Sequence, residues 1–566
     1  MTTWGIDLGT TNSCISRIAG GKPEAVPIDG AAITPSVVLY RPEGVCTGRE
    51  ARNLELSMPE RCVRSVKRRM GGRGPDYSID GRAIPPEEVS AEILRALKSG
   101  AERETGQEVR DVVITVPAYF DDAQRRATLR AGELAGLHVL RLLNEPTSAS
   151  LIYDRVGATE EADGPEIVMV YDLGGGTFDV SVLEAFGDVR EVRATTGNTQ
   201  LGGDDFDELL YRRFCDHLKH ERGVELQPDA ATRAKLQRLA EQTKIALSNS
   251  LEQRVSAEFV GVDAGGAPVH LQLTVTRSEF EELVRPLLQS TIDLARRALD
   301  EARLEGQSLS KICLVGGSTR IPLVRELLAE NFDAEVHEEI DPDLAVALGA
   351  GVQAAMLAGE PLERVLVDVA AHSLGVRVMG DDDLPYGRPD SYAPVLFRNT
   401  VLPCSRSREF YTMTDQQPMI EVDVFQGEAP VCSRNRSIGT FTMELEPRPL
   451  HAPVRVEFTY DLDGVVKVTA SQPGTTRERS VEMRLADKSD APVVAQVVDS
   501  SVLRKAHVWL DELPEDDDAR VELARLVESY EKASPSERDV REDALLDFML
   551  DLDDEDEVAE DANHGG

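Results

Sequence analysis

Three kinds of hydrophobic pattern follow one another along the chain. Up to about residue 359, short apolar runs alternate with segments whose apolar positions recur every three or four residues, as at 87–105 and 230–248. From about 368 to 487 this helical period disappears, and short alternating runs are separated by turn residues. The helical period returns from about 500 to 552. The pattern therefore predicts an α/β region, then an all-β region typical of a β-sandwich, then a short helical region.

Within these regions the pattern assigns individual elements. Residues 1–40 are expected to form an antiparallel meander, and residues 49–70 a helix. Strands are expected at 111–120 and from 139 into a helix start near 145. Further helices are expected at 87–105, 121–136, 230–248 and 343–358. The strands of the all-β region are expected at 374–379, 408–414, 419–426, 439–445, 453–460, 465–470 and 479–484.

One glycine-rich turn stands out because it occurs twice. An apolar run ends in Asp172, turns through Gly174–Gly176, and leaves after Thr177 as a second alternating run. Near the N-terminus, Asp7 ends a similar run and is followed by a turn at residues 9–13. Glycines at such a tip let backbone N–H groups approach an anion closely. A single turn of this kind is as readily a plain hairpin, but two copies predict a clamp that holds a triphosphate and its magnesium from both sides.

Other polar residues near these turns are candidates for the same site. Lys67 lies in a basic cluster and could interact with a γ-phosphate. Such a cluster is more usually a solvated helix face. Glu145 stands at a strand-to-helix turn and could polarise a water or reach a metal, or simply favour the helix start. Glu241, Lys244 and Ser248 share one helix face, which is either a surface ion pair or a polar face against a nucleoside.

A second glycine turn, at residues 316–320, leads from a strand into a helix. It could let a base or ribose lie against the backbone, with Arg320 available to stack on it. Asp343 begins the helix expected at 343–358.

Composition excludes several classes of protein. With 566 residues and 41% hydrophobic residues, the chain is long and apolar enough for several domains. A net charge of −39 argues against non-specific electrostatic binding to nucleic acid or to an anionic membrane. No apolar run is long enough to span a bilayer. Seven scattered cysteines without a Cys-x-x-Cys pair, and a first strand that starts at once, predict reduced thiols and a cytoplasmic location.

Three of these stretches together resemble a known family. Residues 5–14 (GIDLGTTNSC), 113–120 (VITVPAYF) and 172–179 (DLGGGTFD) are similar to the nucleotide-binding signatures of heat-shock protein 70 chaperones of the DnaK type. The resemblance implies a multidomain α/β protein. Its parts would be an actin-like two-lobed ATPase domain at 1–359, a linker at 360–368, a β-sandwich peptide-binding domain at 369–487, a short α-helical lid at 500–552, and an acidic, disordered tail at 553–566.

The resemblance also implies roles for individual residues in binding ATP or ADP. The catalytic set would be Lys67, Glu145, Asp172, Thr177 and Asp7, with Asp7 and Asp172 holding Mg²⁺ through water and K⁺ as a further candidate ion. Phosphates would be held by Gly9, Thr10, Thr11, Asn12, Gly174, Gly175, Gly176 and Thr177. The nucleoside side would be lined by Gly202, Gly203, Glu241, Lys244, Ser248, Gly316, Gly317, Ser318, Arg320 and Asp343.

Further residues are implied in coupling and in peptide binding. The interdomain switch would use Pro117, Arg141, Leu366 and Asp368. The peptide groove would be formed by Val376, Met379, Phe410, Met413, Ile420 and Val422, each of which could equally be a core residue of the sandwich. A groove of this kind pairs an extended peptide through its backbone and takes one apolar side chain.

The chain also departs from the family pattern. Leu129 replaces a basic residue at the domain interface, the linker begins with Arg364, and residues 380–389 look like an insertion near the groove. The first lobe is shorter after Arg73 than in many DnaK proteins, which bears on contacts with a GrpE-like exchange factor. The C-terminal region is short, so we expect faster peptide exchange.

The leading interpretation is an ATP-dependent molecular chaperone that binds and releases extended apolar segments of unfolded proteins, with slow, magnesium-dependent ATP hydrolysis. A J-domain co-chaperone and an exchange factor are the partners that the resemblance implies. The alternative is a nucleotide-dependent co-chaperone or scaffold on the same fold. A sugar or metabolite kinase of the actin-like fold is disfavoured, because such kinases lack a C-terminal β-sandwich.

Overall fold

The computed structural model divides into two units, residues 1–485 and 486–566, which are treated separately. It describes residues 2–72, 76–153, 166–186, 189–222, 229–263, 266–304, 308–337, 340–360, 365–379, 390–461, 466–483 and 518–531. Within these ranges, no helix has both the length and the apolar character needed to cross a membrane.

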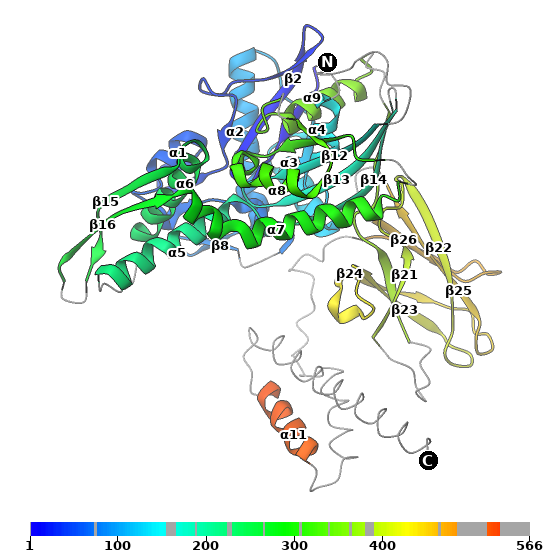
Figure 1. Ribbon diagram of the computed structural model, residues 1–566. Helices are drawn as coiled ribbons and strands as arrows, with labels where there is room; N and C mark the ends of the chain where they lie inside the picture. The colour runs from blue at the N-terminus through cyan, green and yellow to red at the C-terminus, as the bar shows by residue number, and fades with distance from the viewer. Residues whose placement is uncertain are drawn as a thin grey trace. The chain divides into compact units, whose positions relative to one another are not determined.

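A six-stranded mixed sheet forms the centre of the first lobe (Figure 1). Its order is β11-β10-β1-β2-β3, with β4 paired to β2. The central strand β1 pairs in parallel with β10 and in antiparallel with β2. The strands are β1 (Trp4–Asp7), β2 (Asn12–Ala19), β3 (Lys22–Ala25), β4 (Thr34–Pro35), β10 (Asp111–Val116) and β11 (His138–Asn144).

The second lobe repeats this arrangement. Its sheet has the order β18-β17-β12-β13-β14-β19, and the central strand β12 again pairs in parallel on one side and in an antiparallel hairpin on the other. The strands are β12 (Glu166–Leu173), β13 (Phe178–Phe186), β14 (Val189–Asn198), β17 (Lys311–Val315), β18 (Glu335–His337) and β19 (Val365–Val367). The two glycine turns therefore occupy equivalent places, at the tips of the β1–β2 and β12–β13 hairpins.

Helices bury one face of each sheet in a separate core. Helices α2 and α3 pack on the first sheet, and α5 to α8 pack on the second, where α7 is the long helix beside β13 and β14 (Figure 1). Helices α4 and α9 share a third core with residues of both sheets. The helices are α1 (Gly48–Leu54), α2 (Pro86–Thr105), α3 (Asp122–Leu134), α4 (Glu145–Tyr153), α5 (Gly203–Arg222), α6 (Ala230–Asn249), α7 (Arg277–Glu301), α8 (Pro322–Asn331) and α9 (Ala345–Leu357).

Helix α9 fits between the lobes because it is built mainly from alanine and glycine. A Cβ added at Gly5 of β1 would lie 2.1 Å from the backbone nitrogen of Gly351 in α9. A Cβ at Gly349 would lie 1.8 Å from the carbonyl oxygen of Ser148 in α4. Backbones this close leave no room for larger side chains, so small residues set the spacing between the lobes.

The helix expected at 49–70 is wrong. Those residues form α1, the 3₁₀ turn η1 (Pro59–Arg61), the short strand β7 (Cys62–Val63) and the 3₁₀ segment η2 (Val66–Gly72). Helix α1 ends at Leu54, Pro59 begins the 3₁₀ turn η1, and Ser65 adopts a positive φ of 50°. The smaller sheets of the two lobes are β6-β5-β7, β8-β9 and β15-β16, built from β5 (Val38–Arg41), β6 (Gly44–Thr47), β7, β8 (Tyr77–Ile79), β9 (Arg82–Ile84), β15 (Glu252–Val262) and β16 (Pro268–Thr276).

Two four-stranded antiparallel sheets follow, which we call the paired sheets. Their orders are β21-β20-β23-β24 and β22-β25-β26-β27, and their buried side chains form a single hydrophobic core. The strands are β20 (Leu374–Val378), β21 (Ser391–Leu396), β22 (Cys404–Tyr411), β23 (Met419–Gln426), β24 (Arg436–Glu444), β25 (Pro453–Tyr460), β26 (Val466–Ser471) and β27 (Glu478–Glu482).

All seven strands expected in this region are present, with ends that differ by a few residues, and one further strand is added. The pattern does not predict β21, because Pro394 interrupts its sequence SYAPVL. β22 begins at Cys404 rather than 408, because its sequence CSRSREFY alternates little between apolar and polar positions.

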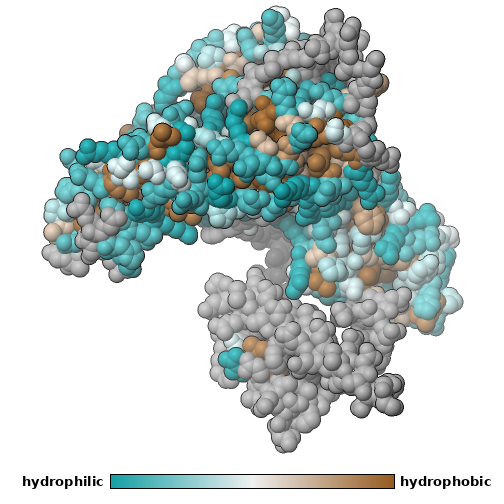
Figure 2. Space-filling model, in the orientation of Figure 1, coloured by the Kyte–Doolittle hydropathy of each residue, from teal (hydrophilic) through white to brown (hydrophobic). Residues whose placement is uncertain are grey.

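The described part of the second unit is the helix α11 (Asp518–Glu531). The rest of the expected lid at 500–552, the tail at 553–566 and the expected insertion at 380–389 lie outside the described residues. The visible face of the described chain is mostly hydrophilic, in keeping with the large net negative charge (Figure 2).

Candidate functional site

The two glycine turns face each other across the gap between the lobes. A Cβ added at Gly175 would lie 1.8 Å from Thr11 Oγ1, and one at Gly176 would lie 2.4 Å from Thr10 Cγ2. Any side chain at either position would therefore push the two turns apart. The clamp expected from the duplicated motif thus brings residues 10–11 and 175–176 into direct contact, although they lie more than 160 residues apart in sequence.

Two further loops join this clamp from the second lobe. The amide of Gly203 donates to the carbonyl of Gly174 at 3.0 Å, and Ser318 Oγ donates to the same carbonyl at 2.8 Å. Gly316 has a positive φ of 80°, and a Cβ there would lie 2.4 Å from the carbonyl oxygen of Leu173. The loops expected on the nucleoside side therefore lie directly behind the phosphate turn.

A cluster of buried charges lies at the ends of the central strands. Lys67 on η2 forms an ion pair with Glu145, the first residue of α4. Asp7 ends β1 and accepts a hydrogen bond from Thr115 at 2.9 Å, while Asp172 lies near the end of β12. Asp179 is the cross-strand partner of Asp172. The aspartates that end equivalent strands of the two lobes thus meet one lysine.

Sequence reasoning missed Asp179 as a site residue. Its carboxylate accepts a hydrogen bond from the amide of Tyr119 at 3.0 Å and is buried. The signal was available, since Asp179 belongs to the DLGGGTFD motif and is held opposite Asp172 by the hairpin register.

Proton affinities in this cluster are strongly shifted. Burial and the charge of Glu145 raise the pKa of Asp7 to about 7. Burial, with the charges of Glu145 and Asp179, raises the pKa of Asp172 well above its usual value. Burial raises the pKa of Glu145 too, although Lys67 opposes it. Burial alone would lower the pKa of Lys67, but the charges of Glu145 and Asp7 outweigh it and raise this pKa.

The excess of carboxylates over positive side chains in this cluster is suited to binding a hydrated divalent cation. Several buried carboxylates share one lysine, and a bound cation would offset the repulsion between their negative charges. Among the described residues, no three His, Cys, Asp or Glu side chains are close enough to ligate a metal directly. A magnesium ion that keeps most of its waters, and touches the protein through them, suits such a site.

The residues expected around the nucleoside differ in how freely they could contact it. Lys244 Nζ donates to Asp207 at 2.9 Å and to the carbonyl of Gly203 at 3.0 Å. Ser248 donates to the carbonyl of Lys244 one helical turn earlier, at 3.4 Å. Arg320 pairs with Asp341 at 2.6 Å and with Asp343 at 3.1 Å, and it is half exposed. Arg320 and Asp343 lie together, as expected, whereas the Ser248 hydroxyl is turned towards its own helix.

Glu241 bridges the lobes. One carboxylate oxygen accepts from Arg52 at 2.6 Å, and the other accepts from Arg64 at 3.1 Å. Arg64 also pairs with the buried Glu55 at 3.1 Å. Burial would raise the pKa of Glu241, but the hydrogen bond and charge of Arg52 lower it. The sequence does not predict either arginine as a site residue, because each reaches Glu241 only where the two lobes lie close together.

The residues expected to switch the domains are divided between the two lobes: Pro117 and Arg141 lie at β10 and β11, and Leu366 and Asp368 lie at β19. Strand β19, which contains Leu366, pairs in parallel with β14. Asp368 is buried and accepts hydrogen bonds from Asn144 at 2.8 Å and Thr147 at 3.2 Å. Asn144 in turn accepts from Arg125 at 2.6 Å. Burial raises the pKa of Asp368.

Pro117 and Arg141 flank this network. The carbonyl of Pro117 accepts a hydrogen bond from the amide of Phe120 at 3.1 Å, which starts the turn into α3. Arg141 lies on β11 opposite Val113. Sequence reasoning missed Arg125 and Asn144 as site residues, although Asn144 directly precedes Glu145.

The expected groove residues fall into two groups. Val376 and Val422 are buried in the core of the paired sheets, and Phe410 and Ile420 are partly buried against that core. Met379 and Met413 are 38% and 58% exposed. The two methionines are therefore available to a peptide, whereas the two valines pack within the protein.

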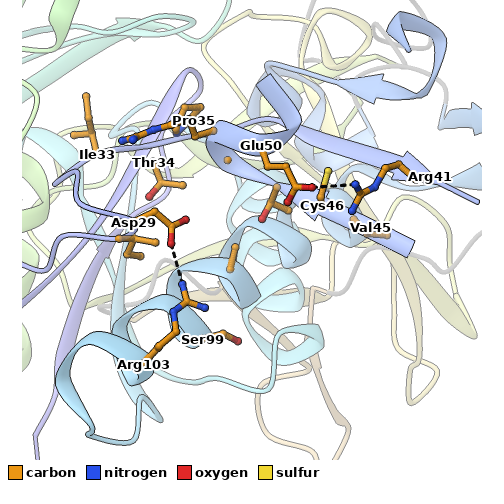
Figure 3. Close-up of a pocket in the computed structure, with 15 residues that line it drawn as sticks. Asp29, Ile33, Thr34, Pro35, Arg41, Val45, Cys46, Glu50, Ser99 and Arg103 are labelled. Carbon is orange, nitrogen blue, oxygen red and sulfur yellow. Dashed lines mark hydrogen bonds and ion pairs between the residues drawn. The ribbon is translucent and has the colours of Figure 1, made fainter. Parts of the chain in front are cut away.

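A separate pocket of about 280 Å³ lies in the first lobe, between β6, the start of α1 and the end of α2 (Figure 3). Arg103 donates across it to Asp29 at 3.1 Å, and Arg41 donates to Glu50 at 2.9 Å. Arg41 and Arg103 are therefore paired with carboxylates that also line the pocket. None of the expected nucleotide-site residues lines this pocket.

Comparison with known proteins agrees with the geometry. The family model for the Hsp70 protein matches residues 3–83 and 73–556. The chaperone proteins DnaK of Thermotoga petrophila, Thermotoga maritima and Thermotoga neapolitana are each 42% identical to the chain over 488 residues. These alignments cover 84% of this chain and 79% of each relative. The chain therefore belongs to the Hsp70 family and is a molecular chaperone.

Proposed function

We propose that this chaperone uses slow, magnesium-dependent hydrolysis of ATP between its two lobes to control a peptide groove in a β-sandwich formed by the paired sheets. The observation that carries the proposal is the meeting of Lys67, Glu145, Asp7 and Asp172 beside two opposed glycine turns. This combination is suited to phosphoryl transfer, in which positioning and charge neutralisation do most of the work. The alternative of a dedicated scaffold or exchange factor gains no support from relatives that are named as chaperones.

Each part of the site has an assigned task. The backbone amides and hydroxyls at residues 9–12 and 174–177 bind the phosphates. Asp7 and Asp172 hold the waters around Mg²⁺, which supplies positive charge against the phosphate oxygens. Glu145 orients the attacking water and accepts its proton, since burial gives this carboxylate a raised pKa. Lys67, which is paired with Glu145 in this structure, supplies an ammonium to the reacting phosphate.

Coupling to the peptide runs through the segment after residue 360. Asp368 lies shortly before β20, the first strand of the paired sheets, and accepts a hydrogen bond from Asn144, which directly precedes Glu145. A change at Glu145 is therefore one residue from the contact that holds Asp368. Exposed Met379 and Met413 contact an extended apolar peptide in this proposal, together with Phe410 and Ile420 at the edge of the core.

The proposed partners follow from the cycle. Clients are extended apolar segments of unfolded proteins, a J-domain co-chaperone stimulates hydrolysis, and an exchange factor of the GrpE type releases ADP. The proposed location is the cytoplasm. The proposed domain limits are 1–359, 360–368, 369–487 and 500–552, followed by the acidic tail.

The direct test of the ATPase is single-turnover hydrolysis of ATP by the full chain, with Mg²⁺ and with EDTA. We expect slow hydrolysis that needs Mg²⁺ and falls at least a hundredfold in Asp172→Asn, while the variant Asp423→Asn, on β23 away from the site, behaves as wild type. Equal hydrolysis in Asp172→Asn and wild type would contradict the assigned site.

A further inference from the structure

The segment that carries Lys67 is held firmly where it begins. Ser65 Oγ donates to Asp204 at 2.5 Å, and Arg68 Nε donates to the carbonyl of Gly176 at 2.8 Å. Arg68 also pairs with Asp205, and its own carbonyl accepts from Gln200 at 3.1 Å. The entry of η2 is therefore fixed to the second lobe and to the phosphate turn itself.

The end of the same segment is held by different elements. Gly71 has a positive φ of 72°, and a Cβ there would lie 2.8 Å from the amide nitrogen of Gln124 in the first turn of α3. The carbonyl of Gly71 accepts a hydrogen bond from Arg436 Nη2 at 2.5 Å. Arg436 is the first residue of β24 in the paired sheets. The exit of η2, four residues after Lys67, is therefore fixed from outside the two lobes.

Arg436 makes a second contact with its other terminal nitrogen. Nη1 pairs with Asp121, the N-cap of α3, whose other oxygen accepts from the amide of Gln124 at 3.0 Å. The Asp121 side chain is 5% exposed, and that of Arg436 is 29% exposed. The planar guanidinium reaches the carboxylate and the carbonyl with two separate nitrogens held at a fixed spacing, whereas a lysine has a single terminal nitrogen. Arg436 thus joins β24, α3 and η2 in one contact.

We propose that Arg436 is a positioning residue through which the paired sheets restrain Lys67. With Arg436 in place, η2 is anchored at both ends and Lys67 stays on Glu145. Loss of the Arg436 contact frees the exit of η2 and lets the lysine leave Glu145 for the reacting phosphate. The inference deepens the proposed function, since it rests on Lys67 acting in ATP hydrolysis.

The chain contains a matched control for this proposal. Gln426 on β23 is the cross-strand partner of Arg436. Its Oε1 accepts from the amide of Asp122 at 3.1 Å, so it also joins the paired sheets to α3. This hydrogen bond reaches α3 directly and does not involve η2. Replacing Gln426 weakens the attachment of the paired sheets alone, whereas replacing Arg436 weakens that attachment and releases the Lys67 segment.

The experiment compares full-length Arg436→Gln and Gln426→Ala with wild type, with saturating ATP and Mg²⁺. Single-turnover hydrolysis gives the rate of the chemical step. Hydrogen exchange at residues 365–367 measures how far the β14–β19 pairing is kept, and exchange at residues 66–72 measures the opening of the Lys67 segment. Arg436→Lys keeps a cation for Asp121 but replaces the two nitrogens that reach Asp121 and Gly71 with one. Asp121→Asn approaches the same contact from α3 and keeps an N-cap residue.

The two variants are compared under conditions in which the amides of residues 365–367 exchange equally slowly, so that the β14–β19 pairing is kept to the same extent. Under these conditions we expect ATP hydrolysis in Arg436→Gln to be at least threefold faster than in Gln426→Ala. Residues 66–72 should lose amide protection in Arg436→Gln and Asp121→Asn, and retain it in Gln426→Ala. Arg436→Lys should fall between wild type and Arg436→Gln. ATP affinity should stay within twofold of wild type throughout.

Equal rates and equal exchange at residues 66–72 in the Arg436 and Gln426 variants would overturn the inference, because Arg436 would then act through attachment alone. These measurements use no peptide, so a failure of the peptide cycle does not change their outcome. Absence of hydrolysis in wild type would instead refute the proposed function.

Discussion

Lys67 and Glu145 form a buried ion pair although they lie 78 residues apart and belong to different elements. Lys67 comes from a 3₁₀ segment, and Glu145 from the first turn of a helix whose N-terminus favours a carboxylate. Both side chains are less than a tenth exposed, so their charges interact through a poorly screened interior. This pair links the phosphate turns on one side to Asn144 and Asp368 on the other.

Replacing Lys67 should lower both the rate of ATP hydrolysis and the stability of the nucleotide-free protein, and the two effects can be measured separately. In Lys67→Ala we expect hydrolysis to fall by roughly a hundredfold, as for loss of one preorganised charge at a transition state. The unpaired Glu145 should also cost about 3–5 kcal/mol in the free energy of unfolding, unless Mg²⁺ and nucleotide are bound. Single-turnover kinetics and thermal unfolding measure the two effects, with exposed Lys22→Ala as control. Unchanged hydrolysis would remove Lys67 from the catalytic set.

The acid cluster predicts an unusual pH dependence of the nucleotide-free protein. The folded pKa of Asp7, about 7, lies above its unfolded value of 3.8, so the folded state binds the proton more tightly. The resulting penalty is absent below pH 4, grows as pH rises, and is complete above pH 7. In EDTA, the Tm should therefore fall between about pH 4 and pH 7 more steeply in wild type than in Asp7→Asn.

Asp7→Asn should also raise the Tm at pH 8 in EDTA, and each kcal/mol gained is worth roughly 2 °C in a chain of this size. Adding Mg²⁺ and nucleotide should flatten the wild-type profile, because the cation supplies the missing positive charge. Identical profiles for wild type and Asp7→Asn would contradict the assigned charge balance.

The contacts of Glu241 predict control of nucleotide release. Arg64 joins the first lobe to Glu241 of the second through a charge-assisted hydrogen bond, which is worth about 1.5–3 kcal/mol. Arg64→Ala should therefore speed ADP dissociation by roughly tenfold and leave single-turnover hydrolysis near the wild-type rate. Stopped-flow release of a fluorescent ADP analogue measures this. Arg61→Ala, which removes a surface pair with Asp80, is the control and should release ADP at the wild-type rate.

Asn144 should be needed for coupling more than for hydrolysis. Asn144→Ala removes the 2.8 Å hydrogen bond to Asp368 and leaves that buried carboxylate short of a donor. We expect basal hydrolysis within threefold of wild type, while the acceleration of peptide release by ATP falls at least tenfold. Exposed Glu421→Gln on β23 is the control. Full acceleration of release in Asn144→Ala would show that coupling takes another route.

Local patterns explain which parts could be predicted from the sequence. The two hairpins, their glycine turns and their terminal aspartates follow from alternation and turn chemistry within about fifteen residues. Because both copies of the motif are local, their symmetric placement could also be inferred. The first-lobe segment 49–70 could not be predicted correctly, since its short pieces are held by distant partners such as Glu241 and Asp204.

The remaining surprises have the same origin. Arg436 and Arg64 look like ordinary surface residues in sequence, and their contacts exist because separate elements approach one another. Val376 and Val422 lie on strands, in which successive side chains point to opposite faces of the sheet. The sequence alone does not tell which of these faces would contact a peptide. Their burial in the core of the paired sheets shifts attention to Met379 and Met413.

The central claim is that nucleotide state controls peptide binding, and one measurement tests it most directly. A labelled, extended apolar peptide is bound to the full-length protein with ADP, and its release is followed after addition of excess unlabelled peptide with ADP or with ATP. The account predicts release at least tenfold faster with ATP than with ADP. Peptide release at the same rate in both nucleotides would contradict it.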